Sequence, residues 1–226
     1  MSNVPVVTID GPSGSGKGTI AKLVAEKLGW NLLDSGALYR VVGLLAERQS
    51  VTADMTAQLG ELALNMPLKF DEQGNPLLNN ENVNDVIRTE TAGNAASKVA
   101  AVPEVRQALL EWQRNYAALP GLVADGRDMG SVVFPDAEVK IFLTASAEER
   151  ANRRYKQLKE KGLDVSIPDL TNEIRERDER DRNRSVAPLV APAAALEVES
   201  SSLTIDQVLE RVLDRVKEAF PELDLG

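Results

Sequence analysis

A glycine-rich loop that contains one lysine is the stretch with the clearest chemistry. Residues 11–19 read GPSGSGKGT, which places Lys17 in the spacing G-x4-G-K. Glycines let consecutive backbone N–H groups curl around an anion, and the N-terminus of a following helix adds the positive end of its dipole. Lys17 supplies a mobile positive charge for the β- and γ-phosphates of a nucleoside triphosphate. The spacing therefore predicts a phosphate-binding loop (P-loop).

The end of this loop departs from the general motif. That motif finishes in Ser or Thr, whereas this chain has Gly18 and carries the hydroxyl one residue later, at Thr19. The usual magnesium ligand is therefore not where the general motif puts it. A plain turn between strand and helix is the alternative interpretation. The β-branched apolar run at 4–9 and the amphipathic segment at 20–28 favour the P-loop, because they supply the strand and helix that the motif demands.

Two later stretches carry charged residues at informative positions. Asp125 follows a short apolar strand at 122–124, where an acidic residue faces magnesium in P-loop proteins, although a plain Asp-Gly turn is the alternative. Arg177, Asp181 and Arg184 stand at i, i+4 and i+7, so they share one helix face. Two arginines that flank an aspartate suit a phosphate and a sugar hydroxyl together. A solvated charged face explains the same spacing equally well.

A further polar group follows the predicted second strand at 30–33. Ser35, Tyr39 and Arg40 come just after the carboxyl end of this strand. Ligands bind at the carboxyl ends of strands in open α/β sheets, so these residues could meet a second substrate. Asp34 and Ser35 are also suited to cap the helix that follows, which is the more common use of such residues.

The composition limits the remaining chemistry. The 226-residue chain is 43% hydrophobic and has a net charge of −9, which suits a globular unit and argues against a nucleic-acid polymer as a partner. It has no cysteine and no histidine. Thiol nucleophiles and zinc–thiolate sites are therefore excluded, and any general base must be Asp, Glu or Lys. We see no signal peptide and no apolar run near the roughly 20 residues that span a bilayer, so we expect a cytoplasmic protein.

The apolar pattern predicts an α/β fold. Further strands are expected at 139–144 and 196–198, and a pair of charged helices at 146–161 and 169–184. Residues 66–85 interrupt the strand–helix alternation with a small hairpin whose turn contains Gly74, followed by a polar loop at 79–85. The other predicted helices span 36–47, 54–65, 89–101, 103–118 and 205–220.

Three classes of function fit a P-loop in such a chain. They are a kinase of a small acceptor, a GTPase switch or motor-type ATPase, and a binding module that holds nucleotide without turnover. A GTPase needs a base-reading element such as Asn-Lys-x-Asp, which is absent from the sequence. A kinase needs a second anion site and an inserted lobe. The arginines at positions 40, 127, 177 and 184 and the insertion at 66–85 favour the kinase.

Several stretches together resemble the bacterial cytidylate kinases, a family of nucleoside monophosphate (NMP) kinases. They are GPSGSGKGT (11–19), LLDSGALYR (32–40), NAASKVAA (94–101), ADGRDMGSVVFPDA (124–137) and RDERDRNR (177–184) with APL (187–189). The Lys-Gly-Thr ending of the loop is usual in NMP kinases. The resemblance implies a P-loop three-layer α/β/α fold with a central five-stranded parallel sheet. It also implies an inserted acceptor-binding lobe with a small antiparallel sheet, and a short helical lid.

The resemblance also implies the domain plan and the reaction. The core would comprise residues 1–34, 119–145 and 186–226, the NMP-binding lobe about 35–118, and the lid about 146–185. The chain would be a monomeric, magnesium-dependent kinase that transfers the γ-phosphate of ATP to CMP or dCMP in pyrimidine nucleotide metabolism. A P-loop kinase of UMP or AMP, or a nucleotide-binding ATPase, is the alternative.

The resemblance assigns roles residue by residue. Arg153 and Arg154 would be lid residues, and Asp125 would hold Mg²⁺ through water. The implied catalytic residues are Lys17, Arg127, Arg177 and Arg184. ATP would be bound by Gly11, Pro12, Ser13, Gly14, Ser15, Gly16, Lys17, Gly18 and Thr19. CMP would be bound by Ser35, Arg40, Ser97, Arg106, Arg127, Asp128, Arg177, Asp181 and Arg184.

Two positions depart from the family pattern. Ala194 stands where the family commonly has Asp, and Glu199 replaces a second Asp. Both fall near the loop expected to flank the adenine, so they affect the predicted contacts to the donor base and not the reaction.

Overall fold

The computed structural model describes residues 4–71 and 75–223, and the predicted turn residue Gly74 lies outside them. The chain divides into two compact units. Unit 1 comprises Met1–Leu33 and Tyr116–Gly226, and unit 2 comprises Asp34–Asn115. Within the described residues, no helix combines the length and the apolar character needed to cross a membrane.

The sheet of unit 1 is built from five short strands. They are β1 (Val6–Asp10), β2 (Asn31–Asp34), β6 (Leu122–Gly126), β7 (Val139–Thr144) and β8 (Leu196–Glu199). Their order is β2-β6-β1-β7-β8, and β1 pairs in parallel with both β6 and β7. The predicted five-stranded parallel sheet is thus confirmed. Because the strand order reverses at β1, the loop after β1 lies at the point where open α/β sheets bind ligands.

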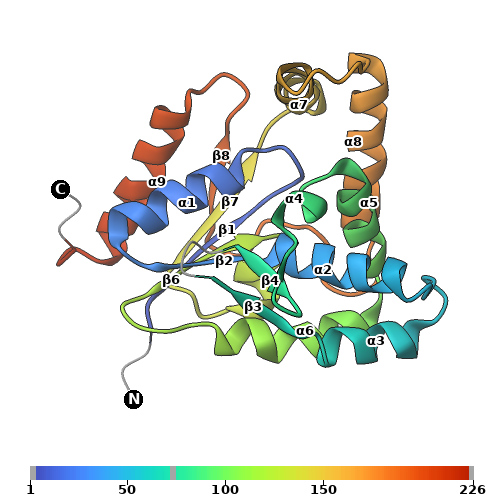
Figure 1. The fold of residues 1–226 in the computed structure, drawn as a ribbon. Helices are drawn as coiled ribbons and strands as arrows, with labels where there is room; N and C mark the ends of the chain where they lie inside the picture. Colours follow the sequence, from blue (N-terminus) through green and yellow to red (C-terminus); the bar gives the residue numbers. More distant parts are fainter. Residues whose placement is uncertain (1–3, 72–74, 224–226) are drawn as a thin grey trace. The chain divides into compact units, whose positions relative to one another are not determined.

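Two helices cover one face of this sheet (Figure 1). They are α1 (Lys17–Leu28) and α9 (Ile205–Ala219), which the capping box of Thr204 and Gln207 begins. Their apolar stripes bury Ile20, Val24 and Val212 against Ile9 and Ile141 of the sheet. This core fixes the N-terminus of α1 beside the carboxyl end of β1.

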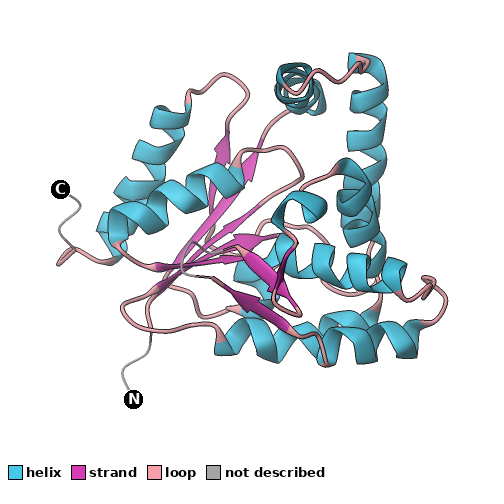
Figure 2. Ribbon diagram, viewed as in Figure 1, coloured by secondary structure: helices cyan, strands magenta, loops and turns pink. Residues whose placement is uncertain are grey.

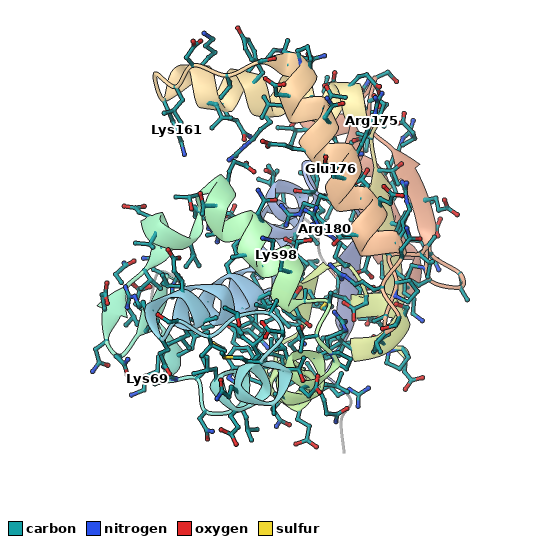
Figure 3. All side chains as sticks on the ribbon, turned by 90° about the vertical axis from the view of Figure 1, so that its right-hand side faces the viewer. Lys69, Lys98, Lys161, Arg175, Glu176 and Arg180 are labelled. Atoms are coloured by element: carbon teal, nitrogen blue, oxygen red, sulfur yellow. The ribbon has the colours of Figure 1, made fainter. Side chains whose placement is uncertain are left out.

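The predicted pair of charged helices forms a hairpin in unit 1. It consists of α7 (Ala147–Glu160) and α8 (Ile167–Arg182), which pack on a small core of Ala151, Leu158 and Leu170. Arg175 of α8 pairs with Glu148 of α7, and Figure 3 shows Arg175, Glu176 and Arg180 along α8. The hairpin therefore has apolar packing of its own as well as charged faces.

Unit 2 is mostly helical, with a small separate sheet (Figure 2). Helix α2 packs closely on α5, since a Cβ on Gly43 would stand 3.1 Å from the Cβ of Ala95. The unit contains α2 (Ser35–Arg48), α3 (Thr56–Leu64), α4 (Asn84–Ile87), α5 (Glu90–Val99), α6 (Pro103–Asn115) and the antiparallel strands β3 (Leu68–Phe70), β4 (Pro76–Leu78) and β5 (Glu81–Asn82).

The structure corrects some of the predicted element boundaries. The segment 79–85 is not only a loop, because β5 pairs with β4 and the buried Val83 leads into the single turn α4. Helix α1 begins at Lys17 instead of residue 20, and α6 ends at Asn115 instead of residue 118. Two-residue strands and single helical turns depend on their neighbours, so local sequence patterns miss them.

Candidate active site

The P-loop connects β1 to α1 with a backbone that only glycine adopts readily. Gly14 has φ 76° and Gly16 has φ 93°, both in the left-handed region. Gly16 is also the N-cap of α1 and provides no side-chain cap. The first N–H groups of α1 therefore have no side-chain acceptor from their N-cap, which leaves them suited to bind an anion.

The predicted lysine of the loop lies within it. Lys17 is mostly buried, and its Nζ donates to the carbonyl oxygen of Pro12 at 3.2 Å. This contact folds the side chain back over the loop. Thr19 is exposed in the first turn of α1. The cradle predicted from the sequence is thus present in the structure, with a cation, N–H groups and a hydroxyl in one short segment.

The irregular residue Gly18 has a physical explanation. A Cβ at this position would lie 3.2 Å from Oδ2 of Asp125, which is closer than most real Cβ contacts. A Ser or Thr side chain there would crowd the carboxylate. Asp125 is the penultimate residue of β6 and is mostly buried. Gly18 therefore allows the acidic residue to lie against the start of α1.

The arrangement fits a magnesium ion held jointly with phosphates. The described part of the chain has no group of three or more His, Cys, Asp or Glu that could hold a metal alone. Mg²⁺ commonly uses one or two carboxylates and completes its shell with water and phosphate oxygens. The single carboxylate of Asp125 beside the P-loop suits that mode of binding.

Asp10 is a residue of the site that sequence reasoning missed. It is fully buried at the end of β1, and its two oxygens accept hydrogen bonds from the N–H groups of Met129 and Gly130, each at 2.8 Å. Burial raises the pKa of Asp10 from its ordinary 3.8 to about 7; the two N–H bonds oppose this rise, and the charges of Asp128 and Asp125 add to it. Asp10 thus ties the start of the P-loop to the turn after β6.

Three arginines lie around the carboxylate of Asp181, and the first of them, Arg127, belongs to the turn after β6. We call Arg127, Arg177, Asp181 and Arg184 the arginine cluster. Arg127 Nε donates to Asp181 Oδ2 at 2.9 Å, and Arg184 Nη2 pairs with Asp181 Oδ1. Burial alone would raise the pKa of Asp181, but the charges of Arg127, Arg184 and Arg177 lower it below its ordinary value. The arginines outnumber the carboxylate, so the cluster suits an anion.

The predicted helix face is only partly correct, because α8 ends at Arg182 and Arg184 lies beyond the helix, although it still pairs with Asp181. Asp181 is only 1% exposed, so it does not lie on a solvated face. Arg127, which directly follows β6, also pairs with Asp181, and helix periodicity could not reveal this partner. Asp128, the next predicted residue, is also buried, with 3% exposure. Unit 1 therefore brings together the P-loop, Asp125 and the cationic and acidic residues predicted near 127 and 181.

The lid arginines make different contacts in unit 1. Arg153 donates to backbone oxygens of Ser15 and Ser200 at 3.2 and 2.7 Å, whereas Arg154 donates to the side chain of Gln157 at 3.3 Å. The two departures from the family pattern are on the same unit. Ala194 has a left-handed φ of 60°, and Glu199 ends β8 and accepts from the N–H of Ser201.

The remaining predicted residues lie in unit 2. Arg40 Nη1 donates to the carbonyl oxygens of Ile87 and Thr89 at 2.6 and 2.9 Å. Its guanidinium therefore links α2 to the segment between α4 and α5. The helix that carries Arg40 begins at Ser35 and is capped by Asp34, which accepts from the N–H of Ala37, as predicted.

Arg106 belongs to a second polar group of unit 2. Its Nη1 donates to the carbonyl oxygen of Ala100 at 3.2 Å, and its guanidinium carbon lies 5.7 Å from the centroid of the Tyr39 ring. Ser97 is buried on α5, with 3% exposure. A cation over an aromatic ring is held in a defined orientation. Unit 2 thus offers oriented donors of the kind that recognise a polar ligand.

Comparisons with known proteins agree on one family. A family model described as cytidylate kinase matches residues 7–218. A protein named cytidylate kinase from Aeromonas salmonicida (strain A449) is 60% identical over 225 residues, which cover 98% of this chain and 96% of that one. One from Klebsiella pneumoniae (strain 342) is 56% identical over 220 residues, with 96% and 97% covered.

A solved structure supports the fold. An uncharacterized protein from Eubacterium ventriosum aligns with a TM-score of 0.51 at 11% sequence identity and covers 96% of this chain and 99% of its own.

Proposed function

The chain belongs to the cytidylate kinase family, and we propose how its residues divide the work of the reaction. The protein is an ATP-dependent kinase that transfers the γ-phosphate of ATP to CMP or dCMP and releases ADP with CDP or dCDP. A family match over residues 7–218 favours this reaction over the alternatives of a UMP or AMP kinase and an ATPase without an acceptor.

We assign the donor ATP to the P-loop. The N–H groups of the loop and of the first turn of α1 bind the β- and γ-phosphates. Lys17 stabilises the negative charge that develops on the phosphates during transfer. The left-handed Gly14 and Gly16 support this role, because they allow successive amides to face one anion. The departures at Ala194 and Glu199 concern only the surroundings of the adenine.

The arginine cluster receives the phosphate of the acceptor. Arg127 and Arg184 flank the buried Asp181, which orients both guanidinium groups, and Arg177 adds a further positive charge. Asp181 and Arg177 also bind the pentose. Ser35 and Arg40 bind the acceptor nucleotide, and Ser97, Arg106 and Asp128 recognise the edge of cytosine, where oriented donors and acceptors distinguish the base.

The chemical step needs no general base. The attacking atom is a phosphate oxygen of CMP, which is already an anion at neutral pH, and the chain has no histidine. Catalysis then consists of positioning the reactants and neutralising charge during an in-line transfer. Lys17 and the arginine cluster supply the positive charge, and exclusion of water prevents hydrolysis of ATP.

Asp125 would hold a magnesium ion, through water, together with the phosphates of ATP. Such an ion would neutralise part of the charge of the phosphates. The carboxylate is kept close to the start of α1 by the absence of a side chain at Gly18.

One observation carries the proposal beyond the family name. The P-loop and the arginine cluster around the buried Asp181 are parts of the same unit. A module that only binds a nucleotide and transfers no phosphate would need the P-loop but not the arginine cluster. We further propose that the protein acts as a monomer in the cytoplasm, where its nucleotide substrates occur. The absence of cysteine is compatible with that compartment.

A coupled assay of ADP release tests the reaction. We expect ADP release to depend on CMP or dCMP, and to be much slower with UMP, AMP or shikimate. ADP release that needs no acceptor would favour an ATPase, and ATP binding without turnover would favour a binding module. Sedimentation of the purified protein tests the monomer.

A further inference from the structure

Two arginines of α7 donate hydrogen bonds to the backbone of the P-loop. Arg150 Nη1 lies 2.9 Å from the carbonyl oxygen of Ser13, and Arg153 Nη1 lies 3.2 Å from that of Ser15. The two carbonyls are two residues apart in the loop. These contacts join segments that are separated by 137 and 138 residues in the sequence.

The first of these arginines is held in place by a buried ion pair. Arg150 Nη1 and Nη2 contact the two oxygens of Asp178 at 2.9 and 2.5 Å, and Arg150 and Asp178 are only 3% and 4% exposed. Arg150 Nε donates to the carbonyl oxygen of Ala145 at 2.9 Å. A forked pair of this kind fixes the plane of the guanidinium, so Arg150 meets Ser13 in one orientation.

The second arginine is held by a different set of groups. Arg153 Nε donates to Glu149 at 3.0 Å, and Nη2 donates to the carbonyl oxygen of Ser200 at 2.7 Å. Ser200 is 2% exposed, and its Oγ lies 3.0 Å from the carbonyl oxygen of Thr144 and 3.4 Å from that of Ser15. The Ser15 carbonyl is thus enclosed by Arg153 and Ser200.

Because of peptide geometry, these contacts also determine how N–H groups of the P-loop are oriented. In a planar trans peptide, the C=O of one residue and the N–H of the next point in opposite directions. Fixing the carbonyls of Ser13 and Ser15 therefore fixes the N–H groups of Gly14 and Gly16, which must point away from the arginines. Both glycines are left-handed, and without side chains their backbones can leave this conformation easily.

We propose that Arg150, Arg153 and Ser200, which we call the loop clasp, are positioning residues that orient the Gly14 and Gly16 amides before ATP arrives. Donors that are already aimed at the phosphates need no reorganisation when the nucleotide binds. The inference rests on the proposed function only in that the P-loop binds nucleotide. It gives Arg153 a role through the backbone of the loop, distinct from direct contact with a phosphate.

Calorimetric titration with ATP in the absence of CMP tests the clasp. For Arg153→Met we expect the dissociation constant of ATP to rise about tenfold, and for Ser200→Ala about threefold, because each loses hydrogen bonds to the loop. Arg153→Lys restores the charge but not the fork that joins two carbonyls, so ATP binding should stay at least about threefold weaker than in the wild type. Full recovery in Arg153→Lys would overturn the proposal.

The serine variant separates positioning from direct phosphate contact. Ser200→Ala removes no charge, so a wild-type dissociation constant in that variant would contradict the clasp. In the double variant that combines Arg153→Met with Ser200→Ala, the dissociation constant of ATP should rise by less than the product of the two single fold-changes. The reason is that both substitutions release the same carbonyl. Additive effects would argue against a shared carbonyl. Lys159→Met on α7 and Ser202→Ala, both exposed, are the matched controls and should bind ATP as the wild type does.

A residue-resolved measurement makes the test independent of activity. Amide spectra with ADP as the probe should show a smaller shift of the Gly16 amide proton in Arg153→Met than in the wild type, and an unchanged shift of Gly14, whose preceding carbonyl is held by Arg150. Equal Gly16 shifts in variant and wild type would refute the role of Arg153. If the wild type instead failed to phosphorylate CMP, the proposed function would fail while these amide shifts still judged the clasp.

Discussion

Three arginines of unit 1 contact buried carboxylates, whereas the contacts described for Arg40 and Arg106 of unit 2 include backbone carbonyls. In unit 1, Arg127 and Arg184 contact the carboxylate of Asp181, and Arg150 contacts that of Asp178. Both aspartates are almost completely buried. Each of these arginines therefore belongs to a pair or cluster of opposite charges removed from water.

In unit 2, two of the candidate arginines donate to the backbone. Arg40 donates to the carbonyls of Ile87 and Thr89, and Arg106 donates to that of Ala100. A carbonyl is a neutral acceptor and does not titrate. A carbonyl that loses its arginine stays uncharged, whereas removing one partner of a buried ion pair leaves a charge.

This difference predicts which property each substitution should change. Changes to the carboxylate-held arginines of unit 1 should affect both folding and transfer, because a buried charge loses its counterpart. Changes to the carbonyl-held arginines of unit 2 should mainly affect how well the acceptor is bound. Three substitutions test this contrast, and a fourth concerns a residue with a left-handed backbone outside both sets of arginines.

The largest effect is expected for Asp181→Asn. It leaves Arg127 and Arg184 without their carboxylate, and breaking a buried pair costs about 3–5 kcal/mol of unfolding free energy. Because the folded-state pKa of Asp181 is lowered, its contribution is present above its ordinary pKa of 3.8 and is lost as the pH falls through the folded value. Urea unfolding from pH 8 to pH 3 should show a constant deficit that narrows only at the acid end.

The exposed Asp164 provides the control for that experiment. Its side chain is fully exposed and pairs with Lys159, so Asp164→Asn should change the unfolding free energy by less than about 0.5 kcal/mol. A loss as small as this in Asp181→Asn would show that the arginine cluster does not depend on its carboxylate.

Arg184→Ala should damage transfer to the acceptor in addition to its cost in stability. A charge-assisted hydrogen bond is worth roughly 1.5–3 kcal/mol, so kcat/KM for CMP should fall at least about tenfold. The dissociation constant of ATP should stay close to that of the wild type. The neighbouring Arg182 is exposed, and Arg182→Ala is the matched control. Normal turnover of the Arg184 variant would remove Arg184 from the acceptor site.

Arg40→Lys tests an arginine of unit 2 that donates to backbone carbonyls. Lysine keeps the charge but cannot present the planar fork of donors with which Arg40 bridges Ile87 and Thr89. We expect KM for CMP to rise roughly threefold to tenfold, with KM for ATP unchanged. Arg48 on the same helix pairs with Glu81 at the surface, so Arg48→Lys should behave as the wild type. If Arg40→Lys lowered the free energy of unfolding as much as Asp181→Asn does, the proposed difference between the two units would be wrong.

Ala194→Gly should alter stability without touching either set of arginines. Ala194 has a left-handed φ of 60°, which costs a residue with a Cβ about 1–2 kcal/mol, and glycine removes that cost at some expense in chain entropy. A gain of about 0.5–1 kcal/mol in thermal or urea unfolding is expected, with unchanged kinetics. Ala195→Gly, which lacks a positive φ, should lose stability.

The sequence was sufficient to predict the parts of the site that are local in the chain. The P-loop, the strand at 139–144 and the cap Asp34 are predictable, because each is set by residues within a few positions of one another. Helix periodicity also suggested that Asp181 and Arg184 are close together, although α8 ends at Arg182 and their pairing does not come from a shared helix face.

The missed features join distant parts of the chain. Asp10 bonds to N–H groups 119 and 120 residues away, and no property of its own segment indicates them. Asp178 belongs to a charge run whose members look alike in the sequence, so its pairing with Arg150 was not distinguishable from a solvated position. The strand β5 exists only through its pairing with β4.

The contact between Gly18 and Asp125 couples two distant positions of the chain. The two positions are 107 residues apart, yet a side chain at one would press on the carboxylate of the other. A Cβ at position 18 would require the Asp125 carboxylate to give by a few tenths of an ångström. Placing the Ser or Thr of general P-loops at position 18 would therefore move an acidic group as well as add a hydroxyl.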